Sequence, residues 1–291
     1  MRTKMAKFSL ILATYDRVHT LPELFESVVA QTGEDVECIV IDQNQDDRLQ
    51  AVVDVWRPRL DIRVVRATPQ LSKARNLGMA AAKGDILVFP DDDCWYSPGL
   101  FKQIREFFEQ HPQYGFLGAG VTDKEGIPSG NRWIQAECEI APVNVFRTSA
   151  THTLFFRNTP ALAAIRFDER IGPNSGTPFA CGEDTDYVLQ AMHAGIRGYF
   201  KRAFLVHHAR RDMLSGNVGE DRAVGYGRGM GHVMRKHKMR ALWAMFLLYD
   251  VARAAICRLT NRGNAAALCL AHARGVKEGY MAGYPVPEAA S

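Results

Sequence analysis

The chain of 291 residues is 47% hydrophobic and 23% charged, a composition typical of a globular protein with a sizeable core. A net charge of +4 and a sequence pI near 8.7 are too mild to indicate nucleic-acid binding. The six cysteines show no CxxC or zinc-ligand spacing, so we expect free thiols in a reducing compartment. The segment Met1–Lys7 lacks a signal-peptide core, and no stretch reaches the length of a membrane span. We therefore expect a cytoplasmic protein.

The first half of the chain alternates short apolar runs with segments of helical spacing. The expected strands are Phe8–Ala13, Glu37–Ile41, Ile62–Val65, Ile86–Phe89 and Phe116–Gly118. The expected helices are Leu21–Ala30, Leu49–Trp56, Ser72–Ala82 and Pro98–Gln110. Strands that alternate with helices of these lengths predict βαβ units, and hence an α/β fold with a mostly parallel sheet.

The elements expected further along the chain are less regular. Gly120–Val145 is rich in glycine, proline and polar residues and predicts a long irregular connection, and loops of that length are usually functional or mobile. Thr153–Phe156 and Leu205–Val206 predict strands, and Asp184–Ala194 predicts a helix. The alternating glycines from Gly225 to Gly231 predict a flexible or closely packed turn.

The character of the sequence changes after about residue 222. We therefore expect one domain over residues 1–222 and a helical extension over residues 223–291. In the extension, the basic stretch Arg235–Lys238 precedes a helical run, Arg240–Leu259, whose segment Ala241–Tyr249 is apolar nearly all round. Nine apolar residues cannot cross a bilayer. A basic lead before apolar and aromatic residues suits insertion into a membrane surface, and packing on the protein's own domain explains the pattern equally well.

Three consecutive aspartates, Asp91-Asp92-Asp93, follow the apolar strand Ile86–Phe89 and Pro90. Open α/β sheets place their ligands at the carboxyl ends of strands. Like charges about 4 Å apart repel by roughly 4 kcal/mol at an effective dielectric of 20, so three carboxylates at a strand end need compensation. A divalent cation that is shared with a diphosphate provides it, and a solvated acidic turn is the alternative. The apolar strand in front favours a metal–nucleotide site.

Five segments, taken in chain order, carry a resemblance to a known family. They are Ser9–Arg17, Ile39–Asp47, Gln70–Gly78, Lys83–Asp93 and Gly182–Asp186. The series, which covers roughly residues 8–208, resembles the family-2 glycosyltransferases of the GT-A fold. These are inverting enzymes that use nucleotide-diphosphate sugars. The resemblance implies a GT-A, Rossmann-like sheet flanked by helices, followed here by the C-terminal helical extension.

The resemblance implies a donor site along the edge of the sheet. Thr14, Tyr15 and Arg17 would line the nucleotide pocket. Asp42 would accept a hydrogen bond from an N–H of the base, and a turn cap is the alternative for this residue. Arg75 would approach the diphosphate, whose charge suits a guanidinium group. The chain departs from its relatives at Gln43, where they often carry a second acid, and at Asp16, where they commonly carry asparagine.

The aspartate run matches the DxD pair of this family. By the resemblance, Asp91 would contact the ribose or the metal, and Asp93 would bind Mn²⁺ or Mg²⁺. Because three aspartates stand in a row, the register is open and Asp92 stays a candidate for the donor site. His207 or His208 would match a histidine that completes the metal shell in many relatives, and the sequence does not distinguish the two.

The pair Glu183-Asp184 resembles the ED motif of the family, whose aspartate is the usual catalytic base. The chemistry requires such a base, because the acceptor hydroxyl loses its proton while it attacks the anomeric carbon. Acidic residues at a helix start, favoured by the helix dipole, are the alternative explanation.

The resemblance as a whole implies a metal-dependent inverting glycosyltransferase, with a UDP-sugar as the favoured donor and a lipid-linked glycan as the acceptor. Cell-surface polysaccharide synthesis is the expected process. The polyprenyl-diphosphate-linked acceptor and a membrane-surface contact through the C-terminal helices imply a location on the inner face of the cytoplasmic membrane. We expect no nucleic-acid partner.

Two other functions remain open. One is a nucleotidyltransferase that makes nucleotide sugars, although Thr14–Val18 lacks the glycine-rich phosphate loop of such enzymes. The other is a catalytically inactive nucleotide-binding protein, which the intact Asp93, Asp184 and His207 disfavour.

Overall fold

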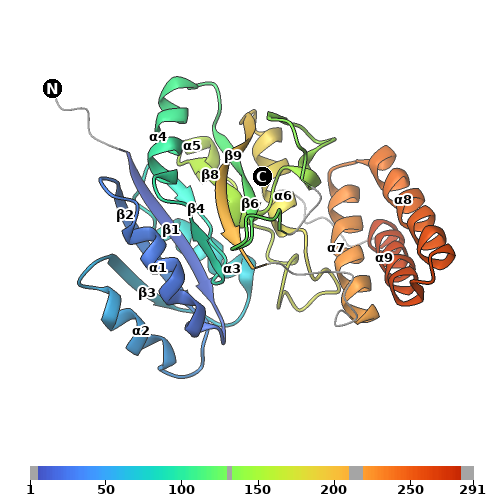
Figure 1. Cartoon of the computed structure of the whole chain (residues 1–291), viewed down its shortest axis with the longest axis horizontal. Helices are drawn as coiled ribbons and strands as arrows, with labels where there is room; N and C mark the ends of the chain where they lie inside the picture. Colours follow the sequence, from blue (N-terminus) through green and yellow to red (C-terminus); the bar gives the residue numbers. More distant parts are fainter. Residues whose placement is uncertain (1–5, 130–132, 210–218, 283–291) are drawn as a thin grey trace, which may run out of the picture. The chain divides into compact units, whose positions relative to one another are not determined.

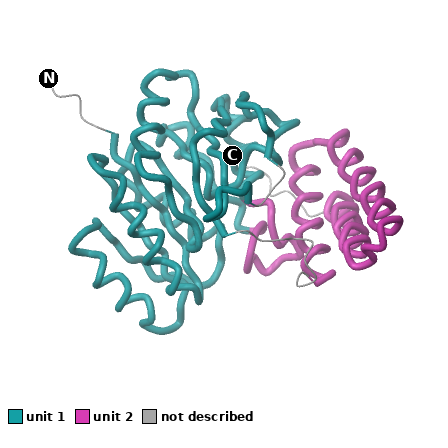
Figure 2. Tube along the Cα trace, in the orientation of Figure 1, with its two compact units in different colours: residues 1–169, 184–211 teal, residues 170–183, 212–291 magenta. Residues whose placement is uncertain are grey.

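The computed structural model describes residues 6–129, 133–209 and 219–282. The chain divides into two compact units, residues 1–169 with 184–211 and residues 170–183 with 212–291 (Figure 2). A division into folding domains at residue 222 stays a prediction, because a compact unit is not necessarily one that folds independently.

The first unit is built on one sheet, in which the described strands follow the order β3-β2-β1-β4-β8-β6-β9-β5, with β7 paired to β9 (Figure 1). The strands are β1 (Lys7–Thr14), β2 (Asp35–Asp42), β3 (Asp61–Arg66), β4 (Ile86–Val88), β5 (Cys94–Tyr96), β6 (Phe116–Thr122), β7 (Cys138–Ile140), β8 (Leu154–Arg157) and β9 (Gly198–His208). Strands β1 to β4 pair in parallel, as do β6 and β9, whereas β8 is antiparallel to both β4 and β6. The predicted α/β class is confirmed. The sheet is mixed rather than mostly parallel, because β5 and β7 are also antiparallel to β9.

Helices cover both faces of this sheet. The helices of the first unit are α1 (Leu21–Val29), α2 (Arg48–Trp56), α3 (Leu71–Ala81), α4 (Leu100–Gln110), α5 (Pro160–Ala163) and most of α6 (Glu183–His193), with short 3-10 turns at Val18–Thr20, Val145–Arg147 and Thr151–Thr153. Phe8, Leu10 and Leu12 of β1 share a core cluster with α1, α2 and α4. The alternate residue Ile11 packs against Gly78 of α3 on the opposite face. Burial on both faces explains why β1 is predominantly apolar on both faces, with Ser9 as a buried polar exception.

Most predicted elements of the first unit agree with the observed bounds to within two residues. Strand β6 extends to Thr122, further than predicted, because its glycines allow close backbone approach. A Cβ at Gly118 or Gly120 would overlap the carbonyl oxygens of Thr148 or Arg202. The expected irregular connection Gly120–Val145 therefore begins inside β6 and also contains β7, which the sequence analysis did not predict.

The second unit contains three long helices, α7 (Glu220–Lys236), α8 (Arg240–Leu259) and α9 (Gly263–Met281). The predicted turn at Gly225–Gly231 is wrong, because these glycines lie inside α7. A Cβ at Gly227 or Gly231 would overlap backbone carbonyl oxygens of α9, so the glycines let the two helices approach closely. This packing offsets a helix-propensity cost of about 1 kcal/mol for each glycine. Within the described part of the chain, no helix combines the length and the apolar character needed to cross a bilayer.

Glu37 of β2 is a buried carboxylate that ties three segments of the first unit together. It accepts hydrogen bonds from the hydroxyl of Ser9 and from the backbone N–H of Lys83, the latter at 2.7 Å. The ammonium of Lys7 lies 3.7 Å away. Burial alone would raise the pKa of Glu37, but these contacts lower it below its ordinary value of 4.5. Ionised Glu37 therefore stabilises the fold above that pH, and this contribution is lost as the pH falls through the folded-state pKa.

We expect Glu37→Gln to lower the free energy of unfolding at neutral pH by about 1–3 kcal/mol, because two buried donors lose a charged acceptor. The difference from wild type should shrink as the pH falls below 4.5. Urea unfolding at several pH values measures it, with the surface variant Glu106→Gln on α4 as the control. A difference that grows on acidification would contradict this interpretation.

Candidate active site

The turn after β4 directs two of its aspartates toward a pair of histidines. Nδ1 of His152 lies 3.3 Å from Oδ2 of Asp91, and Nε2 of His208 lies 3.1 Å from Oδ1 of Asp93. The two imidazole rings stack with their centroids 4.9 Å apart. Ligand atoms of Asp91, Asp93 and His208 lie within 4.8 Å of one another, and no other such group of metal-binding side chains occurs among the described residues. Two carboxylate oxygens and one imidazole nitrogen form a donor set that suits Mn²⁺ and also accommodates Mg²⁺.

Asp92 points away from this cluster. Its Oδ2 accepts a hydrogen bond of 3.3 Å from the hydroxyl of Thr14, at the end of β1. Arg17 pairs with Asp92 and also with Asp93, where Nη1 lies 2.6 Å from Oδ2. Burial raises the pKa of Asp92 to about 6, against the opposing effect of Arg17. The three consecutive aspartates are thus divided, with the first and third facing the histidines and the second facing Thr14.

The adjacent histidines of β9 lie in different environments. Nε2 of His207 lies 2.8 Å from the hydroxyl of Ser97, and its Nδ1 lies 2.9 Å from the hydroxyl of Thr122. Its ring stacks on Trp95, and burial lowers the pKa of His207. Of these two adjacent histidines, only His208 lies next to an aspartate of the cluster, because both ring nitrogens of His207 contact hydroxyl groups instead. A ligand role for His208 remains a proposal.

Arg75 of α3 contributes a buried positive charge beside the cluster. Its side chain is 3% exposed, and Nη2 lies 3.5 Å from Oδ1 of Asp91. The guanidinium group also lies over the ring of Phe167, 5.3 Å from the centroid. With His152 and Arg75 as neighbours, the pKa of Asp91 is lowered well below its usual range, although burial alone would raise it. Asp91 is therefore ionised at neutral pH.

Asp184 is the half-buried second residue of α6 and belongs to the first unit. The backbone N–H of Thr185 donates a hydrogen bond of 2.7 Å to its Oδ1. Burial raises the pKa of Asp184, and the charges of Arg75 and Asp91 also act on it, in opposite directions. A carboxylate that is more basic than usual next to this cluster has the properties of a proton acceptor. Glu183 is assigned to the second unit, where its carboxylate packs against Gly172.

The remaining predicted donor-site residues lie at the ends of β1 and β2. Asp42 is 1% exposed. Its Oδ1 accepts a hydrogen bond of 3.0 Å from the backbone N–H of Asn44, and Nε of Arg66 lies 3.1 Å from its Oδ2. The structure thus shows Asp42 as a turn cap that also pairs with Arg66. Tyr15 follows β1 and is 41% exposed.

His152 is a residue that the sequence analysis did not predict. It lies in the short turn before β8, which runs antiparallel to β4 with Phe155 opposite Val88. The start of β8 therefore meets the carboxyl end of β4, where Asp91 follows. A parallel strand in the same place would carry its first residues to the opposite edge of the sheet. The sequence pattern does not indicate that β8 is antiparallel to β4, so it could not place His152 beside Asp91.

We expect His152→Phe to weaken Mn²⁺ binding by about 10- to 100-fold, as loss of a group that orients a metal ligand commonly does. Phenylalanine keeps a ring that can stack on His208 but loses the nitrogen next to Asp91. His152→Asn, whose side-chain amide can donate to Asp91, should retain more of the affinity. Electron paramagnetic resonance titration of free Mn²⁺ measures the change, with exposed His193→Phe as the control. Wild-type affinity in His152→Phe would contradict a positioning role.

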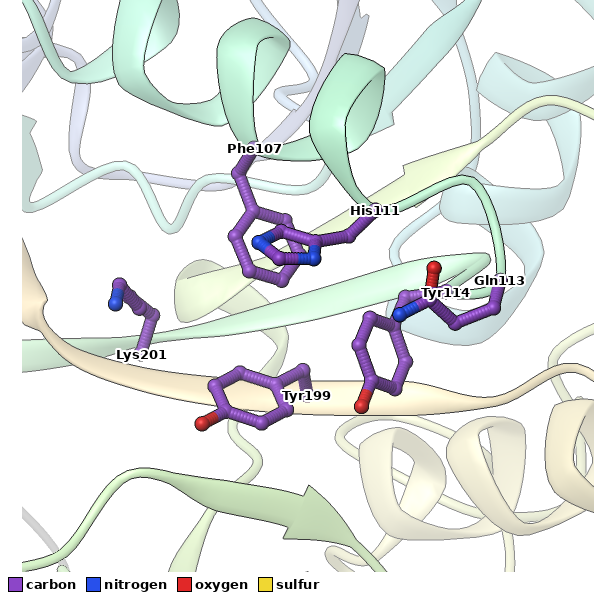
Figure 3. Close-up of a pocket in the computed structure, with 6 residues that line it drawn as sticks. All are labelled: Phe107, His111, Gln113, Tyr114, Tyr199 and Lys201. Carbon is purple, nitrogen blue, oxygen red and sulfur yellow. The ribbon is translucent and has the colours of Figure 1, made fainter.

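A cavity of about 380 Å³ lies elsewhere in the first unit, between the end of α4 and β9 (Figure 3). Its lining residues are Phe107, His111, Gln113, Tyr114, Tyr199 and Lys201. Lys201 precedes His208 by seven residues on β9, which corresponds to roughly 23 Å at about 3.3 Å per residue. The cavity and the aspartate cluster are therefore separate features.

The helix-flanked sheet, with the aspartate cluster where β4 ends, is a fold of the GT-A type. The family model for glycosyl transferase family 2 matches residues 9–169, and the chain belongs to this family. The predicted resemblance is thereby confirmed.

The match to curated relatives covers only part of each relative's length. An uncharacterized glycosyltransferase of Haemophilus influenzae is 32% identical over 110 residues, which cover 38% of this chain and 37% of that protein. Poly(ribitol-phosphate) beta-N-acetylglucosaminyltransferase TarS of Staphylococcus aureus is 27% identical over 164 residues, covering 50% of this chain and 28% of TarS. The chain thus spans 37% of the length of the first relative and 28% of the length of the second.

Two solved structures share the fold. Residues 1–349 of S. aureus TarS, in complex with UDP-GlcNAc, superpose with a TM-score of 0.62 at 18% identity, covering 94% of this chain and 91% of that one. The mannosyltransferase PcManGT of Pyrobaculum calidifontis, in complex with GDP-Man and Mn²⁺, gives 0.64 at 13% identity, covering 96% and 88%. At these identities the comparison establishes the fold.

Proposed function

We propose that this protein is a metal-dependent inverting glycosyltransferase that moves a sugar from a nucleotide-diphosphate donor to a glycan acceptor. The observation that carries the proposal is the convergence of the Asp91–Asp93–His208 donor set with Arg75 and Asp184 in a member of glycosyl transferase family 2. These groups offer, in one place, metal ligands, a cation for a diphosphate and a proton acceptor.

The donor side of the proposal uses residues at the edge of the sheet. Arg75 is a buried guanidinium group that suits the negative oxygens of a diphosphate. A Mn²⁺ or Mg²⁺ ion held by Asp91, Asp93 and His208 would supply positive charge where the leaving diphosphate becomes more negative. Thr14, Tyr15, Arg17 and Asp42 would then hold the nucleoside. We favour a UDP-sugar, because a carboxylate at Asp42 suits the N3–H of uracil and because TarS was crystallised with UDP-GlcNAc.

Asp184 is the proposed base on the acceptor side. It would take the proton of the acceptor hydroxyl as that oxygen attacks the anomeric carbon from the face opposite the diphosphate. The new glycosidic bond forms as the bond to the diphosphate oxygen breaks, so the configuration at the anomeric carbon inverts. The raised pKa of Asp184 supports this role, because a more basic carboxylate accepts a proton more readily.

We further propose that the acceptor is a lipid-linked glycan in cell-surface polysaccharide synthesis, at the inner face of the cytoplasmic membrane. Support comes from the names of two relatives: TarS is named for poly(ribitol-phosphate), and GgaB of Bacillus subtilis is named for minor teichoic acid biosynthesis. In this proposal residues 1–222 form the catalytic domain and residues 223–291 form an extension that faces the membrane or the acceptor.

The test is release of free nucleotide from a panel of UDP-, dTDP- and GDP-sugars in the presence of Mn²⁺. The proposal expects turnover of one donor, with loss of turnover on chelation of the metal. A product analysed by NMR should show inverted anomeric configuration. Release of diphosphate from a nucleoside triphosphate and a sugar phosphate would favour a nucleotidyltransferase instead. A protein that neither binds nor turns over any donor would contradict the proposal.

A further inference from the structure

The outward face of α8 is apolar over most of its length. Between Ala241 and Cys257, all the exposed residues are uncharged, namely Ala241, Met245, Leu248, Tyr249, Val251, Ala252, Ala255 and Ile256. Leu248 is 73% exposed and Ile256 is 61% exposed. A surface helix of a globular protein normally turns its charged side chains toward water and its apolar side chains inward. Between Ala241 and Cys257, by contrast, none of the exposed side chains of α8 is charged.

The acidic residue of α8, Asp250, is buried against α9. Asp250 is 5% exposed, and its Oδ2 lies 2.6 Å from Nδ1 of His272 on α9. Ala254 and Cys257 of α8 share a small buried cluster with residues of α9. Helix α9 therefore covers one face of α8, and the exposed uncharged residues of α8 occupy the other.

Basic residues stand at both ends of this apolar face. The sequence from residue 219 to residue 282 holds eleven lysines and arginines against four aspartates and glutamates. Lys236, Lys238 and Arg240 stand at the amino end of α8, and Arg258 and Arg262 stand at its carboxyl end. An uncharged face between two basic groups is typical of a helix that lies in the plane of an anionic membrane surface.

We propose that the outward face of α8 docks on an anionic lipid surface, with the helix axis parallel to the membrane. The twenty residues of α8 would lie along about 30 Å of the surface. Their apolar side chains would enter the boundary between headgroups and acyl chains, while the basic groups would meet anionic headgroups. A second copy of the chain fits this face less well, because it would bring the same positive charge to the interface. The proposal does not depend on the proposed glycosyltransferase activity.

Co-sedimentation of the full chain with lipid vesicles tests this proposal. Vesicles of phosphatidylcholine alone are compared with vesicles that also contain phosphatidylglycerol. We expect binding to the anionic vesicles, weakened by salt and at least about tenfold weaker without phosphatidylglycerol. The double variant Leu248→Glu/Ile256→Glu should bind the anionic vesicles at least about tenfold more weakly than wild type.

The matched control is Val55→Glu, which adds a charge at an apolar residue of α2 that is 69% exposed. It should bind vesicles as wild type does, and circular dichroism should show that all variants are folded. Wild-type binding by the double variant, equal binding to both kinds of vesicle, or no binding by wild type would each overturn the proposal. A wild-type dimer that the double variant converts to a monomer, with no vesicle binding, would identify a second copy as the occupant.

Discussion

Replacing Asp184 by asparagine should lower kcat by about 10²–10⁴-fold, the range that a positioned general base contributes. Asparagine is close to aspartate in size and keeps an oxygen that can accept the hydrogen bond from Thr185. It has no carboxylate to receive the proton of the acceptor hydroxyl. Donor affinity should change little, because the donor is proposed to contact Arg75 and the aspartate pair. Steady-state kinetics with the donor identified in the panel, together with calorimetric titration of UDP, separates the two effects.

The matched control for this variant is Asp186→Asn in the same helix. Asp186 is fully buried, and Nε2 of Gln190 donates a hydrogen bond of 2.7 Å to its Oδ2. Asparagine at this position should lower thermal stability while leaving turnover of the folded protein much less affected. Equal loss of kcat in the two variants would indicate that both residues support the helix, and Asp184 would no longer be the base.

Replacing Asp93 by asparagine should remove most of the affinity for Mn²⁺. The carboxylate supplies one of the three ligand atoms that lie within 4.8 Å of one another. Loss of a ligand should weaken binding by more than the 10- to 100-fold that loss of an outer partner typically causes. Turnover should fall at least in proportion, because less of the protein holds the metal at a given concentration. Titration of Mn²⁺ followed by electron paramagnetic resonance measures the affinity.

The neighbouring aspartate provides the control for Asp93→Asn. Asp92 contacts Thr14 and Arg17 and does not face the histidines. Asp92→Asn should therefore weaken Mn²⁺ binding much less than Asp93→Asn does. An equal decrease in Mn²⁺ affinity in the two variants would mean that the metal binds a different pair of the three aspartates than Asp91 and Asp93.

Much of the fold was predictable from local sequence pattern. Strands β1 and β4 are buried on both faces, so each is a predominantly apolar run that a short window detects. The helices between them have clear amphipathic spacing. The glycines of α7 were misread because their role depends on α9, whose residues come more than thirty positions later. A close approach between distant helices leaves no mark in a local window.

The candidate site was predictable to the extent that its residues lie in recognisable motifs. Asp91, Asp93, Arg75 and Asp184 were proposed from their place in the ordered series, and the structure brings them together. The choice between His207 and His208 required the sheet, because adjacent residues of a strand point to opposite faces. His152 required the antiparallel direction of β8, which no motif encodes.

In the proposed function, Asp91, Asp93 and His208 hold a divalent cation that is shared with the diphosphate of the donor. This sharing is tested most directly by titrating Mn²⁺ into the protein with and without saturating UDP. We expect UDP to tighten Mn²⁺ binding by about 5- to 150-fold, the usual range for coupled ligands, and this coupling to disappear in Asp93→Asn. Mn²⁺ affinity that is the same with and without UDP, or coupling that survives in Asp93→Asn, would contradict the proposal.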